Sequence, residues 1–171
     1  MVSIGEKWHT GEATVAIEHF ATQFFMQHLM SMLAAAGAPV RSGTIVAGCA
    51  PGETHQIGLL MLVVMLRWRG WDVKYLGADM SLENLAEALE PLHPRLLLFT
   101  ATRPEAAAAL QPLKSLLQRF PPPVPQVVLG GQAFQQPVNA ADLPGEVLSV
   151  SPKEMVHAIE VKLSSQVLSR N

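Results

Sequence analysis

The amino-acid sequence predicts an α/β fold, in which helices cover both faces of a five-stranded parallel sheet and a long helical segment precedes it. From Val40 onward, short apolar runs alternate with segments of helical periodicity, a pattern typical of parallel sheets. Hydrophobic residues make up 49% of the 171 residues and charged residues 15%. The chain can therefore bury a core large enough for one ordinary domain with a small appendage.

The first forty residues predict one long helix. Thr10 is a suitable N-cap, no proline interrupts residues 11–36, and Gly37 and Pro39 end the helix. Apolar residues recur along it at helical spacing, namely Val15, Ile17, Phe20, Phe24, Phe25, Leu29, Met32 and Leu33. Because this apolar surface is too broad for a solitary surface helix, the helix must pack against the following domain, a partner chain, or both.

Strands and helices then alternate along the chain. We predict strands at Thr44–Ala47, Asp72–Tyr75, Arg95–Thr100, Gln126–Leu129 and Glu146–Val150. We predict helices at Ile57–Arg69, Ser81–Leu89, Pro104–Phe120 and Pro152–Leu168, with a short additional helix near Gln132–Gln136. The proline-rich stretch 120–125 is interpreted as a helix stop and a stiff connection into the fourth strand.

Composition and missing motifs argue against several classes of function. The formal charge of −2 and the lack of an arginine–lysine cluster argue against direct binding to DNA. Neither glycine-rich phosphate motif, G-x-G-x-x-G or G-x-x-x-x-G-K-[ST], is present. The longest apolar run, 57–66, is too short to span a bilayer. The single cysteine, Cys49, fits a small buried residue in a reducing compartment, and no secretion signal is visible, so we expect a cytoplasmic protein.

The turn after the first strand carries the main candidate site. Glu53 and His55 lie between that strand and the next helix, which places them at the carboxyl edge of the sheet, where open α/β folds bind ligands. His55 can bind a metal through one ring nitrogen if an acceptor such as Glu53 holds the other. Gly58 would let a bulky planar ligand approach the backbone. Alone, a loop histidine more often makes only local hydrogen bonds.

Small or hydroxyl-bearing residues follow three strands at the same edge of the sheet. Thr100-Ala101-Thr102 ends the third strand, Gly130-Gly131 ends the fourth, and Gly48 and Ala50 flank the end of the first. Each alone would fit an ordinary tight turn. Together they predict a slot that runs down beside the sheet near His55.

These motifs resemble those of cobalamin-binding proteins. E-x-H-x-x-G at 53–58 is similar to D-x-H-x-x-G, and the later G-G matches that signature, whereas Thr100-Ala101-Thr102 departs from its S-x-L element in both defined positions. Trp8 followed by Glu18-His19, together with E-x-H and the continuation G-G-Q-A-F, resembles the CarH and LitR light-responsive regulators of the MerR family. The resemblance implies a Rossmann-like (flavodoxin-like) cobalamin-binding domain at 40–171. It also implies a partial helical-bundle cap at 1–39, over the upper face of the cofactor.

The resemblance also implies a role for each site residue. His55 would be the lower axial cobalt ligand and Glu53 its hydrogen-bonding partner, while Thr100 or Thr102 would bond the displaced dimethylbenzimidazole tail in the slot formed with Gly130 and Gly131. Trp8 would cap the upper face, Glu18 and His19 would line the adenosyl pocket, and His9 could take the upper position after photolysis. In isolation, Trp8 would more often be core, Glu18 a solvated side chain and His19 a satisfied helix histidine.

The function implied is a photoreceptor and regulatory domain that binds adenosylcobalamin and is not an enzyme. Light would break the cobalt–carbon bond, and the lost contacts would change conformation or oligomeric state and so control transcription. One alternative is a corrinoid module of a methyltransferase system, with methylcobalamin. Another is an interaction module that needs no cobalamin.

Such regulators also carry a winged-helix DNA-binding domain and a complete four-helix bundle, and neither is found in this sequence. The chain is therefore either a fragment or a sensor that acts through a partner protein. An uncovered apolar helix face predicts self-association, either as a homo-oligomer or with a regulatory partner.

Overall fold

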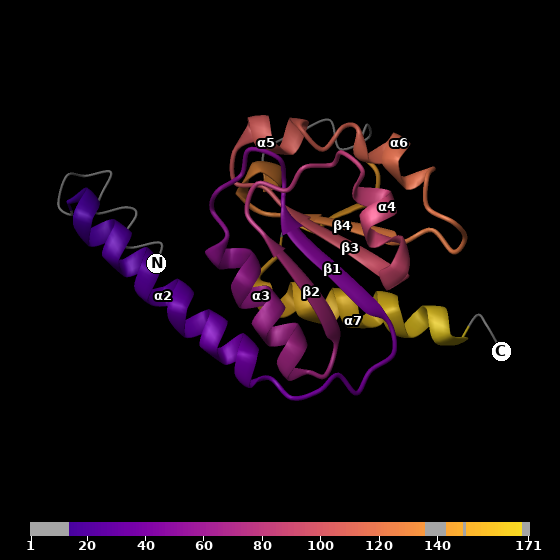
Figure 1. Ribbon diagram of the computed structural model, residues 1–171, viewed down its shortest axis with the longest axis horizontal. Helices are drawn as coiled ribbons and strands as arrows, with labels where there is room; N and C mark the ends of the chain where they lie inside the picture. The colour runs from indigo at the N-terminus through magenta and orange to yellow at the C-terminus, as the bar shows by residue number, and fades with distance from the viewer. Residues whose placement is uncertain (1–13, 136–142, 149, 169–171) are drawn as a thin grey trace.

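The computed structural model describes residues 14–135, 143–148 and 150–168. Within them, five parallel strands form one sheet in the order β2-β1-β3-β4-β5. The strands are β1 (Thr44–Cys49), β2 (Asp72–Gly77), β3 (Pro94–Thr100), β4 (Gln126–Gly130) and β5 (Glu146–Leu148). The predicted fold class is confirmed (Figure 1).

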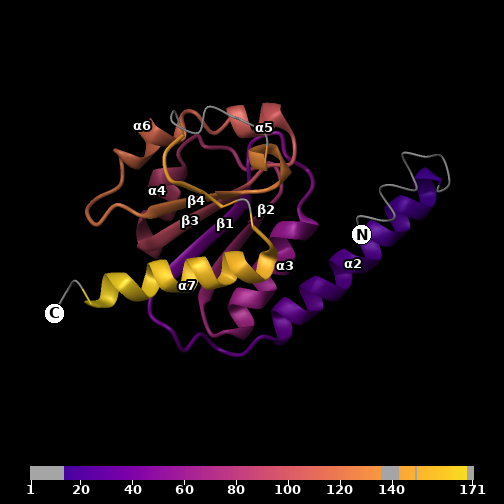
Figure 2. The same cartoon turned by 180° about the vertical axis from the view of Figure 1, so that it is seen from behind.

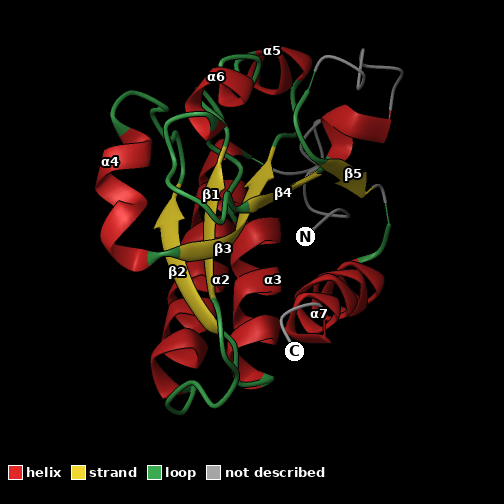
Figure 3. Ribbon diagram, turned by 90° about the vertical axis from the view of Figure 1, so that its right-hand side faces the viewer, coloured by secondary structure: helices red, strands yellow, loops and turns green. Residues whose placement is uncertain are grey.

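Helices cover both faces of this sheet (Figures 1 and 3). One face carries α3 (Ile57–Trp68) and α7 (Pro152–Leu168). The other face carries α4 (Leu85–Leu89), η1 (Glu90–Leu92), α5 (Pro104–Ala108), α6 (Leu113–Leu117) and η2 (Gln132–Gln135). Two apolar clusters result, one on each side of the strands, because successive side chains of a strand point to opposite faces. β1 and β3 are buried along almost their whole length, as expected for central strands of a parallel sheet.

Three predicted helices need correction. The first helix, α2 (Val15–Ala35), begins after Thr14, whose side chain accepts a hydrogen bond from the Ile17 amide, whereas the predicted cap Thr10 lies outside the described residues. The helix predicted from Ser81 begins only at Leu85, because Asn84 has φ +54°. The helix predicted across 104–120 is divided into α5 and α6. Pro112 lies at the break and lacks the amide hydrogen that a continuous helix requires.

The amino-terminal helix α2 contacts α3 but buries none of its own residues. Its carboxyl end is held by two hydrogen bonds, from Trp68 Nε1 to the Met32 carbonyl (3.0 Å) and from the Arg67 guanidinium to the Gly37 carbonyl (3.3 Å). The amino end projects away from the sheet domain (Figures 1 and 2), and Phe20 is 72% exposed. The prediction that α2 packs on the following domain therefore holds only at its carboxyl end, and an apolar face is left uncovered.

Candidate functional site

The candidate site lies at the carboxyl edge of the sheet, where the chain connections diverge. From β1 the chain crosses to β2 on one side, and β3 lies on the other side of β1. Open α/β folds bind ligands at such a switch point. The β1–α3 loop and the β3–α5 loop meet there, since the Ala50 amide donates to the carbonyl of Thr100 (2.9 Å). Residues about 50 positions apart in sequence are thus brought side by side.

Glu53 is buried, and its carboxylate joins these two loops. Oε1 accepts hydrogen bonds from the backbone amide (2.8 Å) and from Nδ1 (2.7 Å) of His55. Oε2 accepts from the amide (2.5 Å) and hydroxyl (2.7 Å) of Thr102 and from the amide of Arg103 (3.3 Å). Five donors therefore converge on one carboxylate, which satisfies both oxygens away from water.

This arrangement fixes the ionisation state of Glu53. Burial, the largest single influence, raises the pKa of the carboxyl group. The hydrogen bonds from His55 and Thr102 outweigh it together and lower the pKa of Glu53 from 4.5 to about 2. Glu53 is consequently a carboxylate at neutral pH and can only accept hydrogen bonds. His55 must then carry its proton on Nδ1, because that nitrogen faces Oε1.

The tautomer leaves the second ring nitrogen of His55 available. None of the hydrogen bonds among the described residues uses Nε2, and the side chain is 65% exposed. A neutral imidazole held through Nδ1 by a carboxylate is a good metal ligand through Nε2, because the bonded partner fixes the ring and raises its basicity. The predicted pairing of Glu53 with His55 is confirmed, and coordination of a metal by His55 stays a prediction.

The backbone close to His55 is open at Gly58. A Cβ atom built on Gly58 would meet no described atom within 4 Å. The packing of this chain therefore does not explain why a glycine stands there. An imidazole with a free nitrogen, next to an open backbone at the start of α3, fits a metal carried in a broad planar group.

The predicted slot needs correction, because its residues lie on two different faces. Gly48 and Ala50 face the α4–α6 side, where the Met80 side chain comes within 2.6 Å of a Cβ built on Gly48. Thr100 faces the α3–α7 side and donates to Cys49 Sγ (3.7 Å), and Gly130 meets Met155 of α7 on that side. The prediction of one common slot was wrong because successive residues of a strand face opposite sides of the sheet, as Gly48 and Cys49 do.

Thr100 and Thr102 make different contacts, and so do Gly130 and Gly131. Thr102 is bonded to Glu53, whereas Thr100 lies on the α3–α7 face beside Cys49. Gly131 has φ +110°, and a Cβ there would lie 2.2 Å from the Ala101 carbonyl oxygen. Gly131 is therefore required for close backbone approach. Thr100 and Gly130 both lie on the α3–α7 face, where the Met155 methyl group, 2.7 Å from a Cβ built on Gly130, fills the space beside α7.

The structure places the remaining predicted residues away from this cluster or does not describe them. Glu18 accepts a hydrogen bond from Thr22 (2.7 Å) within α2, and His19 lies 3.9 Å from Glu18 with its side chain 72% exposed. Their contacts are local to α2, so their role over the cofactor stays a prediction. Trp8 and His9 lie outside the described residues.

Sequence reasoning missed two residues that contact the His55 turn. The Arg103 guanidinium donates to the Gly52 carbonyl, and the Asp79 carboxylate accepts from the Gly52 amide (2.7 Å). Asp79 follows β2 and Arg103 follows β3, and parallel strands end at one edge of a sheet. Their positions just after two predicted parallel strands could therefore have indicated both residues from the sequence.

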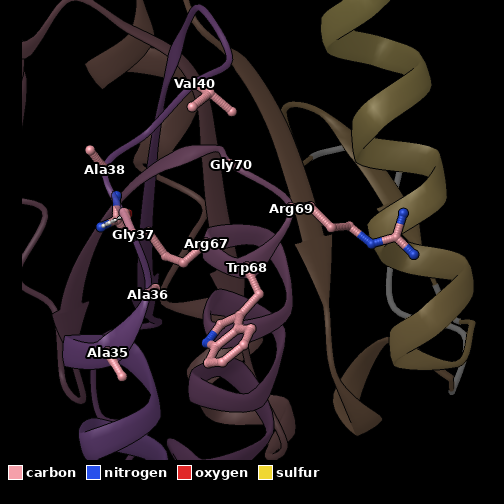
Figure 4. Close-up of a pocket in the computed structure, with 9 residues that line it drawn as sticks. All are labelled: Ala35, Ala36, Gly37, Ala38, Val40, Arg67, Trp68, Arg69 and Gly70. Carbon is pink, nitrogen blue, oxygen red and sulfur yellow. Dashed lines mark hydrogen bonds between the residues drawn. The ribbon is translucent and has the colours of Figure 1, made fainter.

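A hollow of about 300 Å³ lies at the opposite edge of the sheet, between the carboxyl ends of α2 and α3 (Figure 4). Two arginines line it, but each is already engaged elsewhere. Arg67 pairs with Asp72 (3.8 Å), and Arg69 points away toward α7, where it pairs with Glu160 (2.8 Å). This hollow therefore lies between the carboxyl ends of α2 and α3, and its arginines are paired with carboxylates of the same chain.

The fold and the site together define a Rossmann-like domain with one exposed imidazole, held by a buried carboxylate, at the carboxyl edge of its sheet. Residues 43–151 match the family described as "B12 binding domain". This match covers more than half of the chain, so the chain belongs to that family, and cobalamin is the cofactor that it supports.

The chain is similar to transcriptional repressors and to a corrinoid protein. The HTH-type transcriptional repressor CarH of Myxococcus xanthus is 34% identical over 134 residues, which is 78% of this chain and 44% of that protein. The methanol–corrinoid protein of Methanosarcina barkeri (strain Fusaro / DSM 804) is 29% identical over 117 residues, 67% of this chain and 45% of that protein. The chain thus spans about half the length of the curated relatives it matches. The resemblance to CarH-type cobalamin-binding domains is confirmed.

A solved structure shares the fold. The Methanosarcina barkeri monomethylamine corrinoid protein superposes with a TM-score of 0.67 at 18% identity, covering 92% of this chain and 76% of that one. In the described residues, no helix combines the length and apolarity needed to cross a membrane.

Proposed function

We propose that the chain is the adenosylcobalamin-binding photoreceptor domain of a transcriptional regulator, and that it works without catalysing a reaction. The observation that carries the cofactor assignment is the pair of buried Glu53 and exposed His55, with Nε2 free. The choice of a regulator is supported by the 34% identity to a transcriptional repressor over 134 residues, a longer stretch than the family match at 43–151.

His55 would hold the cobalt from beneath through Nε2, while Glu53 keeps the ring in its Nδ1–H form. Thr100 and Gly130 would line the place of the displaced base on the α3–α7 face, and the Met155 side chain, which fills that space, would move to admit it. When bound, adenosylcobalamin supplies a cobalt–carbon bond that light can break. Glu18 and His19 of α2, with Trp8 and His9, would line the adenosyl side and sense its loss.

The route from the site to α2 would run along α3. That helix begins at Ile57, two residues after His55, and ends at Trp68, which bonds the Met32 carbonyl of α2. A rigid helix that joins the metal ligand to the α2 anchor could couple the state of the cofactor to the position of α2. The uncovered face of α2, with Phe20 and Phe24, would then bind a second copy or a regulatory partner.

The test is an absorption spectrum of the protein loaded with adenosylcobalamin, recorded in darkness and again after green light, with size-exclusion chromatography of both samples. We expect a base-off spectrum that changes irreversibly, together with a change in oligomer size. A His55→Ala variant serves as the control and should lose the histidine-ligated spectrum. A spectrum that green light leaves unchanged would contradict the photoreceptor proposal while leaving cobalamin binding intact.

A corrinoid module of a methyltransferase system is the second candidate, supported by the 29% identity to a methanol–corrinoid protein. It predicts tighter binding of methylcobalamin than of adenosylcobalamin, and transfer of the methyl group to an added thiol when a methyltransferase is supplied. If the protein prefers adenosylcobalamin and transfers no methyl group, this candidate fails.

A further inference from the structure

The loop between β2 and α4 is hydrogen-bonded to the turn that carries Glu53 and His55. The Gly52 amide donates to Asp79 Oδ1 (2.7 Å), and the Asp79 amide donates to the Glu53 carbonyl (2.8 Å). These two bonds flank the Cα of Glu53, one before it and one after it. A third bond, from the Met80 amide to the Cys49 carbonyl (3.2 Å), ties the same loop to the end of β1.

The backbone at both ends of this contact restricts which residues can form it. Asp79 has φ +51° and Gly52 has φ +74°. Left-handed backbone favours glycine, and Asp and Asn tolerate it better than other residues with a side chain. Asp79 combines that tolerance with an acceptor oxygen aimed at Gly52. The Arg103 guanidinium takes the Gly52 carbonyl from the other side, so both ends of this residue are held.

We infer that Asp79 is a positioning residue for the cobalt ligand. It fixes the backbone of Gly52 and Glu53, which sets where the Glu53 carboxylate lies. That carboxylate in turn sets the tautomer and the direction of the His55 ring. The inference rests on the proposed role of His55, and it extends that site to a third loop. Outer partners of a metal ligand commonly change metal affinity by about 10-fold to 100-fold.

Four variants separate this role from general stabilisation. Asp79→Asn keeps both the acceptor oxygen and the tolerance for φ +51°, whereas Asp79→Ala loses both. Asp79→Gly keeps the backbone freedom and removes only the acceptor. Asn84→Ala is the matched control, because Asn84 also has a positive φ (+54°) in the same β2–α4 connection and its side chain makes no capping hydrogen bond.

Two measurements follow in each variant. Imidazole 15N chemical shifts of the protein without cofactor report the tautomer of His55. Titration with adenosylcobalamin, followed by its base-off, histidine-ligated spectrum, reports affinity and ligation. We expect Asp79→Ala and Asp79→Gly to lose the pure Nδ1–H form and to bind about 10-fold more weakly, with a smaller histidine-ligated fraction. Asp79→Asn and Asn84→Ala should match the wild type.

The inference is overturned if Asp79→Gly keeps the wild-type tautomer and ligation, or if Asn84→Ala is as deficient as Asp79→Ala. If Asp79→Ala does not fold, Asp79→Gly decides the question. If the wild type binds no corrinoid, the proposed function fails. The tautomer of His55 in the protein without cofactor still tests whether Asp79 positions the ring.

Discussion

Replacing Glu53 by Gln should weaken the fold in a way that depends on pH. The pKa of Glu53 is lowered from 4.5 to about 2 in the folded protein. Each pKa unit corresponds to about 1.4 kcal/mol, so the carboxylate stabilises the folded state by about 3 kcal/mol at pH 7. Because the folded pKa is the lower one, this stability is present above pH 4.5 and is lost as the pH falls toward 2. About 2 kcal/mol should be gone by pH 3.

Urea denaturation of wild type and Glu53→Gln at pH 7 and pH 3 measures this contribution. At pH 7 the variant should be at least about 3 kcal/mol less stable, because Gln has only one acceptor oxygen, so its NH2 group must face the donors of either His55 or Thr102 and Arg103. By pH 3 the gap should narrow by about 2 kcal/mol. Glu83→Gln, at an exposed position, is the control and should behave as wild type. A gap of the same size at both pH values would refute the assignment of a strongly bonded carboxylate.

Three further variants test other parts of the account. Thr102→Val removes the hydroxyl bond to Glu53 and should cost about 1–2 kcal/mol in urea denaturation, more than Thr22→Val, whose hydroxyl bonds Glu18 on α2; equal costs would argue against a special role for Thr102. Gly58→Ala should not lower the melting temperature, since a Cβ there meets nothing within 4 Å and Ala favours the helix, but should weaken corrinoid binding; unchanged binding would show that the cofactor does not approach Gly58. Phe20→Ser combined with Phe24→Ser should reduce self-association in analytical ultracentrifugation, and an unchanged sedimentation distribution would exclude the exposed face of α2 as the contact.

The sheet and the Glu53–His55 pair could be predicted because both depend on short-range sequence. Alternating apolar runs and helical periods define parallel βαβ units without knowledge of tertiary contacts. Glu53 and His55 belong to one turn, so two residues of separation already place their side chains together. The break at Pro112 was also visible in the sequence, because proline lacks the amide hydrogen of a helix interior, but the prediction of one helix over 104–120 did not use it.

The other contacts of the site could not be obtained in this way. Thr102 and Arg103 reach Glu53 across about 50 residues, and Asp79 reaches Gly52 from another loop. Such contacts depend on which strands are neighbours and on their register, which local patterns do not specify. The two-sided placement of Gly48 and Gly130 depends on where each strand ends, and a shift of one residue reverses the face.

Electron paramagnetic resonance of bound cob(II)alamin, in protein carrying 15N only in its histidines, tests the lower ligand most directly. If His55 Nε2 binds cobalt, each cobalt hyperfine line should split into a doublet, because 15N has spin one-half, and the doublet should vanish in His55→Ala. Triplets from an unlabelled nitrogen would mean that the cofactor keeps its own base, and they would contradict the assignment of His55.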